Sequence, residues 1–348
     1  MSNYTVSTVY PSDRTAGRQV VELLEREGIR RDKNLDYTCA IYDPEGTVVA
    51  TGSCFKNTLR CVAVKSSHRG GALLNTMVTH LMEVQASRGN VHIFIYTKQS
   101  LIRVFRDLGF HEIARVQGEL VFMENRRDGF AAYLAQLAER RASGERIAAV
   151  VMNANPFSLG HLFLIEAAAR ENEAVHVFIV SEEASLFPVS VRRSLIIEGT
   201  RHLENVLYHD TGSYIVSNST FPSYFQKDDD SVIRGHAHLD VTLFQRIAEC
   251  LGINRRYVGY ESDSRVTSIY NDTMKELLPG LGVEYIEVPR LALDGRVVSA
   301  STIREAIRDG DMELARSLMP ASTWEYIAGS ESSPVVQAIK ASENVIHY

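Results

Sequence analysis

The sequence predicts an α/β protein in which a mixed α/β region is followed by a parallel sheet covered by helices on both faces. The chain has 348 residues and is 45% hydrophobic, which is enough for ordinary cores in two domains. Continuous apolar runs alternate with helical patterns through its second part, as in parallel sheets. Three strand-like runs separated by turns occur in its first part and indicate a small meander.

The first region is expected to span residues 1–125. Its strands are predicted at 35–42, 48–53, 59–64 and 91–96, with two more short strands near its end, and its helices at 71–85 and 99–108. A charged, alanine-rich segment follows, and its apolar residues recur at helical spacing. We therefore expect a connecting helix within 126–145.

The second region is expected to span residues 146–328. Strands are predicted at 147–152, 175–180, 205–208, 256–259 and 283–288, with helices between them and a last helix from about 300. In such a sheet the ligand crevice lies beyond the carboxyl ends of the strands. Residues 329–348 are weakly patterned, so we expect a loose carboxyl-terminal tail.

A polar turn follows the first strand of the second region. Asn153 and Asn155 mark the carboxyl end of that strand, and Gly160 lets the next helix start close against it. His161 then lies near a helix amino terminus, where backbone N–H groups and the helix dipole favour a phosphate. A nucleoside triphosphate is the first ligand to consider. The alternative, that these polar residues only cap a helix and fill a turn, stays open.

A second candidate anion site lies far downstream. Ser299, Ser301 and Thr302 cluster at a predicted helix start, and Arg304 follows one turn later. Hydroxyls and a guanidinium in this arrangement can bind a phosphate group. The alternative is an ordinary serine cap with a solvent-exposed arginine.

The amino-acid composition argues against several classes of binding partner. The formal net charge of −6 argues against a nucleic-acid-binding surface. No apolar run approaches the roughly 20 residues that span a bilayer, and the amino terminus lacks a signal pattern, so we expect a soluble, cytoplasmic protein with no membrane partner. The four cysteines show no metal or disulfide spacing and are expected to be buried free thiols.

The two polar motifs together resemble those of the nucleotidyltransferase superfamily, whose members carry an H/T-x-G-H turn and an I-S-x-[ST]-x-x-[RK] helix start. Here the turn is Ser158-Leu-Gly-His161 and the helix start is Val298-Ser-Ala-Ser-Thr-Ile-Arg304. Ser158 replaces the first His or Thr, and its hydroxyl can still donate one hydrogen bond. This resemblance implies a Rossmann-like nucleotidyltransferase fold for the second region.

Further phrases resemble the citrate lyase ligase family in more detail. They are Met152-Asn-Ala-Asn-Pro-Phe157, Ser185-Leu-Phe-Pro188, Gly199-Thr200, Thr220-Phe-Pro-Ser-Tyr-Phe225, Tyr257-Val-Gly259, Arg265-Val-Thr267, Tyr270-Asn271 and Ser299-Ala-Ser301. The same family begins with a region similar to the N-acetyltransferase fold, which 60–64, 69–74 and 104–110 resemble. Ala72 and Leu74 stand where acetyltransferases carry Gly and Gly or Ala, so we expect no independent acetyl-CoA catalysis there.

The resemblance implies an ATP-dependent ligase. Acetate would attack the α-phosphate of ATP to give acetyl-adenylate and pyrophosphate, and the acetyl group would pass to a thiol on the citrate lyase acyl carrier subunit, which bears a CoA-like prosthetic group. Mg²⁺ would bridge phosphate oxygens without a dedicated protein cage. The first region would then aid recognition of the carrier.

The resemblance also assigns site residues. His161 would contact the α- and β-phosphates, and Arg304 with the hydroxyls of its motif would bind the leaving pyrophosphate. The turn that holds the nucleotide would comprise Asn153, Asn155, Phe157, Ser158 and Gly160.

Other candidates have alternative explanations. The resemblance implies that Arg192 would contact phosphate or acyl substrate, and a surface ion pair is the alternative. By the same resemblance Gly259 and Glu261 would border the nucleotide, although their neighbours depart from the family pattern. The segment 221–227 resembles a family segment that would line an acyl or carrier entrance, and the acidic run after it is expected to be a solvated loop. His236 and His238 have no third ligand spaced to join them, so no metal site is expected.

The sequence is also compatible with two other functions. One is a nucleotidyltransferase that leaves AMP on its product, similar to phosphopantetheine adenylyltransferase. The other is a noncatalytic module that binds a CoA-like arm and a nucleotide, against which the presence of both His161 and Arg304 argues.

Overall fold

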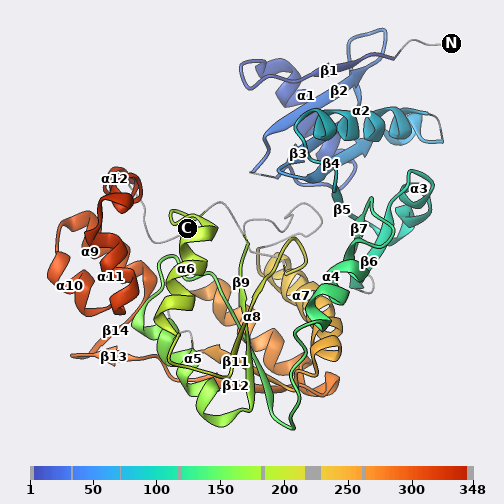
Figure 1. Cartoon of the computed structure of the whole chain (residues 1–348). Helices are drawn as coiled ribbons and strands as arrows, with labels where there is room; N and C mark the ends of the chain where they lie inside the picture. The colour runs from blue at the N-terminus through green and yellow to red at the C-terminus, as the bar shows by residue number, and fades with distance from the viewer. Residues whose placement is uncertain are drawn as a thin grey trace. The chain divides into compact units, whose positions relative to one another are not determined.

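The computed structural model describes residues 4–32, 34–70, 72–116, 120–181, 185–215, 229–260 and 264–342 (Figure 1). The chain divides into two compact units. Unit 1 comprises residues 1–132 and 218–242, and unit 2 comprises 133–217 and 243–348. Residues 229–242 therefore belong to unit 1 although residues of unit 2 precede and follow them in the sequence.

Unit 1 is built on a seven-stranded sheet with the order β1-β2-β3-β4-β5-β7-β6. Its strands are β1 (Val6–Thr8), β2 (Tyr37–Tyr42), β3 (Val48–Phe55), β4 (Thr58–Val64), β5 (Phe94–Thr97), β6 (His111–Val116) and β7 (Leu120–Glu124). β4 and β5 are parallel and the other pairs are antiparallel. The mixed sheet and the β2–β3–β4 meander confirm the prediction.

The helices of unit 1 include α1 (Arg14–Arg26), which is explained by a polar N-cap residue and by apolar residues at helical spacing. Further helices are α2 (Leu73–Ser87) and α3 (Ile102–Asp107), with short 3₁₀ turns η1 (Ser66–His68) and η2 (Gln99–Leu101). Asp13 caps α1 by accepting a hydrogen bond from the Ala16 N–H, 2.9 Å away. Val20, Leu23 and Leu24 recur at helical spacing and are buried.

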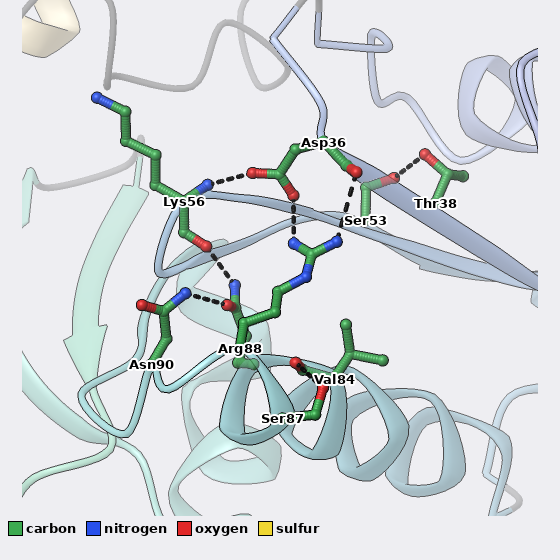
Figure 2. A network of polar contacts seen from close by, with 9 residues as sticks. Asp36, Thr38, Ser53, Lys56, Val84, Ser87, Arg88 and Asn90 are labelled. Carbon is green, nitrogen blue, oxygen red and sulfur yellow. Dashed lines mark hydrogen bonds and ion pairs between the residues drawn. The ribbon is translucent and has the colours of Figure 1, made fainter. Parts of the chain in front are cut away.

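A polar network joins the end of α2 to the meander (Figure 2). One Asp36 carboxylate oxygen accepts from the Arg88 guanidinium at 2.6 Å, and the other accepts from the Lys56 N–H at 2.6 Å. Gln85 donates to the Lys56 carbonyl and accepts from Asn90. Because the Lys56 backbone is bound from both sides, the β3–β4 turn is fixed against α2.

Unit 2 is built on a five-stranded parallel sheet with the order β10-β9-β8-β11-β12. Its strands are β8 (Ile147–Met152), β9 (Ala174–Ile179), β10 (Val206–Asp210), β11 (Arg255–Gly259) and β12 (Glu284–Val288). The chain runs outward from β8 to β10 and returns to pair β11 with β8. This is a topological switch point, where parallel sheets bind ligands beyond the strand ends.

Helices and a hairpin complete unit 2. They are α5 (Leu159–Glu171), α6 (Val189–Gly199), α8 (Arg265–Leu277), η3 (Pro279–Leu281), β13 (Ala292–Leu293), β14 (Arg296–Val297), α9 (Ala300–Asp309), α10 (Met312–Ser317) and α11 (Ala321–Ala328). Two helices carry residues of both units, α4 (Gly129–Ala138) and α7 (Asp229–Leu251). α4 is the helix predicted within 126–145, and α7 is one of the helices expected between the strands predicted at 205–208 and 256–259.

The expected loose tail is wrong for residues 330–341. They form η4 (Ser330–Ser332) and α12 (Ser333–Ala341). Val335 and Ile339 lie one helical turn apart, are 7% and 0% exposed, and join the core of unit 2. In the described part of the chain, no helix is both long enough and apolar enough to cross a bilayer.

Candidate active site

The turn after β8 is closed by a reciprocal cap. Ser158 is the N-cap of α5, and its Oγ accepts from the His161 N–H at 3.2 Å. The His161 Nδ1 accepts in return from the Ser158 N–H at 3.1 Å and lies 2.8 Å from its Oγ. Helix capping is therefore one of the roles of His161. Since Nδ1 is an acceptor, the proton of the neutral ring is on Nε2.

The His161 ring is neutral at neutral pH. Burial, together with the positive charges of Arg290 and Arg304, lowers its pKa to about 4. Within the described part of the chain, Nε2 makes no hydrogen bond, so its N–H is an available donor. A neutral donor can bind a phosphate oxygen without first losing or gaining a proton.

A cavity of about 410 Å³ lies at the carboxyl ends of β8, β11 and β12. It brings together both polar motifs, although they are far apart in the sequence. The predicted site residues that line it are Asn153, Asn155, Ser158, Gly160, His161, Gly259, Ser299, Ser301 and Arg304.

The second motif forms the start of α9. Ser299 is its N-cap, and the Ser299 Oγ accepts from the Thr302 N–H at 3.0 Å and lies 2.8 Å from the Thr302 hydroxyl. Arg304 is only 3% exposed, so the alternative of a solvent-exposed arginine is wrong. Its guanidinium donates to the Asn155 carbonyl and to the Ser301 Oγ. The arginine of one motif thus binds the backbone of the other.

Gly160 explains how closely the motifs approach. A Cβ at this position would lie 2.8 Å from the Val298 carbonyl oxygen, closer than real Cβ contacts. The amino termini of α5 and α9 can therefore face one cavity only if residue 160 has no side chain. The dipoles of the two helices place partial positive charge at these amino termini, which favours an anion there.

Three predicted ligand-binding residues do not line the cavity. Phe157 is fully buried in the core, and Thr302 serves the cap of α9. Arg192 is also fully buried, so the surface ion pair considered for it is wrong. Its guanidinium donates to the Phe187 carbonyl at 3.0 Å and to the Asn153 carbonyl at 2.7 Å, supporting the turn from behind. Glu261 and the segment 221–227 lie outside the described residues.

Sequence reasoning missed Arg290. It follows β12 after a single proline, lines the cavity, and donates from Nε to the Tyr260 carbonyl at 2.9 Å. A usable signal existed, because a basic residue just past the carboxyl end of a parallel strand lies at the ligand-binding edge. Among the described residues that line the cavity, no carboxylate is present. The cavity is therefore suited to an anion.

The cysteines play no part in this arrangement. All four are free, and Cys39, Cys54 and Cys61 are buried, as expected; Cys250 is less so. Burial raises the pKa of each of the three buried thiols to about 12. They are protonated at neutral pH and lie outside the cavity, so none is a nucleophile for it.

The fold and the site define a class of protein: an α/β protein in which a parallel sheet presents a cavity suited to an anion at its switch point. A family model described as the citrate lyase ligase C-terminal domain matches residues 147–327. The chain is 33% identical over 315 residues to the [Citrate [pro-3S]-lyase] ligase of Escherichia coli, covering 89% of each chain. It is 36% identical over 285 residues to that of Klebsiella pneumoniae, covering 80% of this chain and 83% of the relative. The chain belongs to the citrate lyase ligase family.

Solved structures also match part of the chain. An acyl-CoA N-acyltransferase from Pseudomonas aeruginosa is 12% identical, with a TM-score of 0.30, and the match covers 35% of this chain and 99% of that one. A bifunctional NMN adenylyltransferase/ADP ribose pyrophosphatase from Francisella tularensis is 16% identical, with a TM-score of 0.37, over 57% of this chain and 52% of that one.

Proposed function

We propose that this chain activates acetate with ATP and transfers the acetyl group to the thiol of the citrate lyase acyl carrier subunit, which bears a CoA-like arm. In the first step an acetate oxygen bonds to the α-phosphorus of ATP. The bond from that phosphorus to the bridging oxygen breaks, and pyrophosphate leaves with the electron pair. In the second step the carrier thiolate bonds to the acetyl carbonyl carbon and AMP leaves.

The observation that carries the proposal is the composition of the unit 2 cavity. Two helix amino termini, the Nε2–H of His161 and two guanidinium groups surround a space without a described carboxylate. Adenylyl transfer needs positioned donors and cations for the charge that develops on phosphate oxygens, more than it needs proton transfer. A neutral His161 suits this need because it donates a hydrogen bond at neutral pH.

Mg²⁺ is expected to enter with ATP. The described cavity residues offer amide, hydroxyl and backbone oxygens, and no described group of three or more His, Cys, Asp or Glu side chains is arranged to hold a metal. These residues fit a cation that is bound chiefly by phosphate oxygens and water. Its chemistry would be to neutralise charge on the triphosphate.

For unit 1 we propose a role in receiving the carrier arm. β4 and β5 pair at Thr58–Phe94 and Leu59–Ile95 only, and beyond those pairs a cavity of about 510 Å³ is lined by both strands. Diverging strands offer backbone groups to an extended, amide-containing arm. Leu74 lines the same cavity, at the position where acetyltransferases keep a small residue for the coenzyme phosphates.

Acetate-dependent exchange of labelled pyrophosphate into ATP, measured without carrier, tests the first step. We expect exchange with acetate and none with phosphopantetheine. Exchange with phosphopantetheine alone would overturn the proposal in favour of nucleotide transfer. If neither compound supports exchange, the assay is repeated with the carrier, and silence there also contradicts the proposal.

The carrier role is tested by filling the unit 1 cavity in the full chain, because a deletion before residue 140 would separate residues 229–242 from the rest of unit 1. Ser100 is exposed and lines the cavity, whereas Ser87 is exposed at the end of α2. Ser100→Trp should raise the KM for carrier about tenfold or more and leave pyrophosphate exchange intact. Ser87→Trp is the control. Equal carrier KM in the two variants would reject this role.

A further inference from the structure

The two arginines of the unit 2 cavity are held differently. Arg304 is 3% exposed, and its guanidinium donates both to the Asn155 carbonyl in the β8 turn and to the Ser301 Oγ in its own helix. These contacts connect the two polar motifs across the cavity. Removing the guanidinium would leave a buried carbonyl without that donor, which destabilises a folded protein.

Arg290 is half-buried and comes from the loop after β12. Its Nε donates to the Tyr260 carbonyl at 2.9 Å, and the Tyr260 N–H in turn donates to the Val288 carbonyl at 2.8 Å. These two hydrogen bonds connect the residue just past β11 with the end of β12 and the loop that follows it. The guanidinium is anchored by its inner nitrogen at the strand edge and lines the cavity.

The charge of Arg290 also acts on His161, which is another hydrogen-bond donor of the cavity. Among the charges that lower the pKa of His161, that of Arg290 has a larger effect than that of Arg304. Two positive groups that both act on His161 create a field in which an anion beside the imidazole would be stabilised.

We propose that Arg290 is a catalytic residue that contacts the ATP polyphosphate and stabilises the negative charge on the departing pyrophosphate, whereas Arg304 is a positioning residue that holds the two motifs together. The assignment to pyrophosphate departure rests on the proposed function. The contact with a polyphosphate does not, because it follows from the cavity and its charges.

The test compares four full-length variants. Arg290→Gln removes the charge, and Arg290→Lys keeps a point charge without the planar fork. Arg304→Gln removes the buried guanidinium. Arg296→Gln is the matched control, because Arg296 is an exposed arginine of the nearby hairpin strand β14 and does not line the cavity. Binding of inorganic pyrophosphate is measured by calorimetry, exchange by isotope, melting temperature by circular dichroism, and the His161 titration by NMR.

We expect Arg290→Gln to lose about a hundredfold in exchange and at least tenfold in pyrophosphate affinity, with the melting temperature of the control. Arg290→Lys should recover part of both. The pKa of His161 should rise in Arg290→Gln and stay unchanged in Arg296→Gln. Arg304→Gln should instead lower the melting temperature by several degrees.

Pyrophosphate affinity and exchange in Arg290→Gln equal to those of Arg296→Gln would overturn the inference. So would an Arg304→Gln variant with an unchanged melting temperature and the larger loss of pyrophosphate affinity, because the two roles would be reversed. If the wild-type chain shows no acetate-dependent exchange, yet Arg290→Gln still loses pyrophosphate affinity, the polyphosphate contact stands and the proposed function fails.

Discussion

His161 has two roles, helix capping and the proposed phosphate binding, and each role uses a different ring nitrogen. Its Nδ1 accepts the Ser158 N–H and closes the helix cap, while its Nε2–H is the donor proposed for phosphate. Glutamine at the third position of a helix can also accept the N-cap N–H. His161→Gln therefore keeps the cap and removes the imidazole donor, whereas His161→Ala removes both.

We predict that both variants lose pyrophosphate exchange by about a hundredfold, the scale of losing a transition-state donor. Only His161→Ala should lose stability, by about 1 kcal/mol, the usual contribution of a cap. Exchange assays and thermal melts check this, with the exposed His202 changed to alanine as the control. Wild-type exchange in His161→Gln would remove the imidazole from the mechanism.

The wild-type exchange rate should also show no His161 titration between pH 6 and 8. Burial and the adjacent arginines hold the pKa of this imidazole near 4, so its protonation state is constant in that range. An exchange rate that follows a group with a pKa near 6.5, and loses that dependence in His161→Gln, would contradict the neutral-donor role.

The first residues of α5 and the residues just before α9 lie in close contact, so a change in one helix start would displace the other. A Cβ on Gly160 would meet the Val298 carbonyl at 2.8 Å, and backbone cannot move aside as a flexible side chain can. We predict that Gly160→Ala separates the two helix starts and raises the KM for ATP about tenfold, measured by exchange. Gly17→Ala in α1, where a Cβ meets nothing within 4 Å, is the control. An unchanged KM in Gly160→Ala would mean that the helices tolerate the shift.

Sequence reasoning succeeded where the elements carry strong local signals. The strands of unit 2 were predicted because buried parallel strands are continuously apolar, as in β8 and β9. The short helix α12 was missed because its buried positions, Val335 and Ile339, are too few to establish a period. The residues of the cavity that belong to a motif were predicted. Arg290 was not, because it belongs to no motif and only its position just past the predicted strand 283–288 indicated it.

The described part of unit 2 contains three imidazoles that the fold keeps neutral. His176 in β9 and His209 in β10 are both buried, and their Nδ1 and Nε2 atoms lie 2.8 Å apart. Burial lowers the pKa of His176 to about 4, and burial with the charge of His176 lowers that of His209 to about 3. His161 is the third, with its pKa near 4.

These lowered pKa values determine the direction in which the unfolding free energy changes with pH. An unfolded histidine binds its proton near pH 6.5, so between pH 6.5 and about 4 the unfolded chain binds more protons than the folded one. Stability from these groups is therefore complete above pH 6.5 and is lost as the pH falls. Each pH unit by which the fold lowers a pKa corresponds to about 1.4 kcal/mol of stability, which is lost once the pH is below the folded pKa.

We predict that the unfolding free energy of the wild-type chain falls steeply from pH 6.5 to 4.5, and that His209→Gln flattens this fall because glutamine can hydrogen-bond to His176 without titrating. Denaturant unfolding followed by tryptophan fluorescence reports on unit 2 directly, since the chain has a single tryptophan, Trp324 in α11. His202→Gln, at an exposed histidine, should keep the wild-type slope. The difference between the two slopes isolates the buried pair from the carboxylates that titrate in the same range. Identical slopes in all three proteins would show that the pair is not kept neutral by the fold.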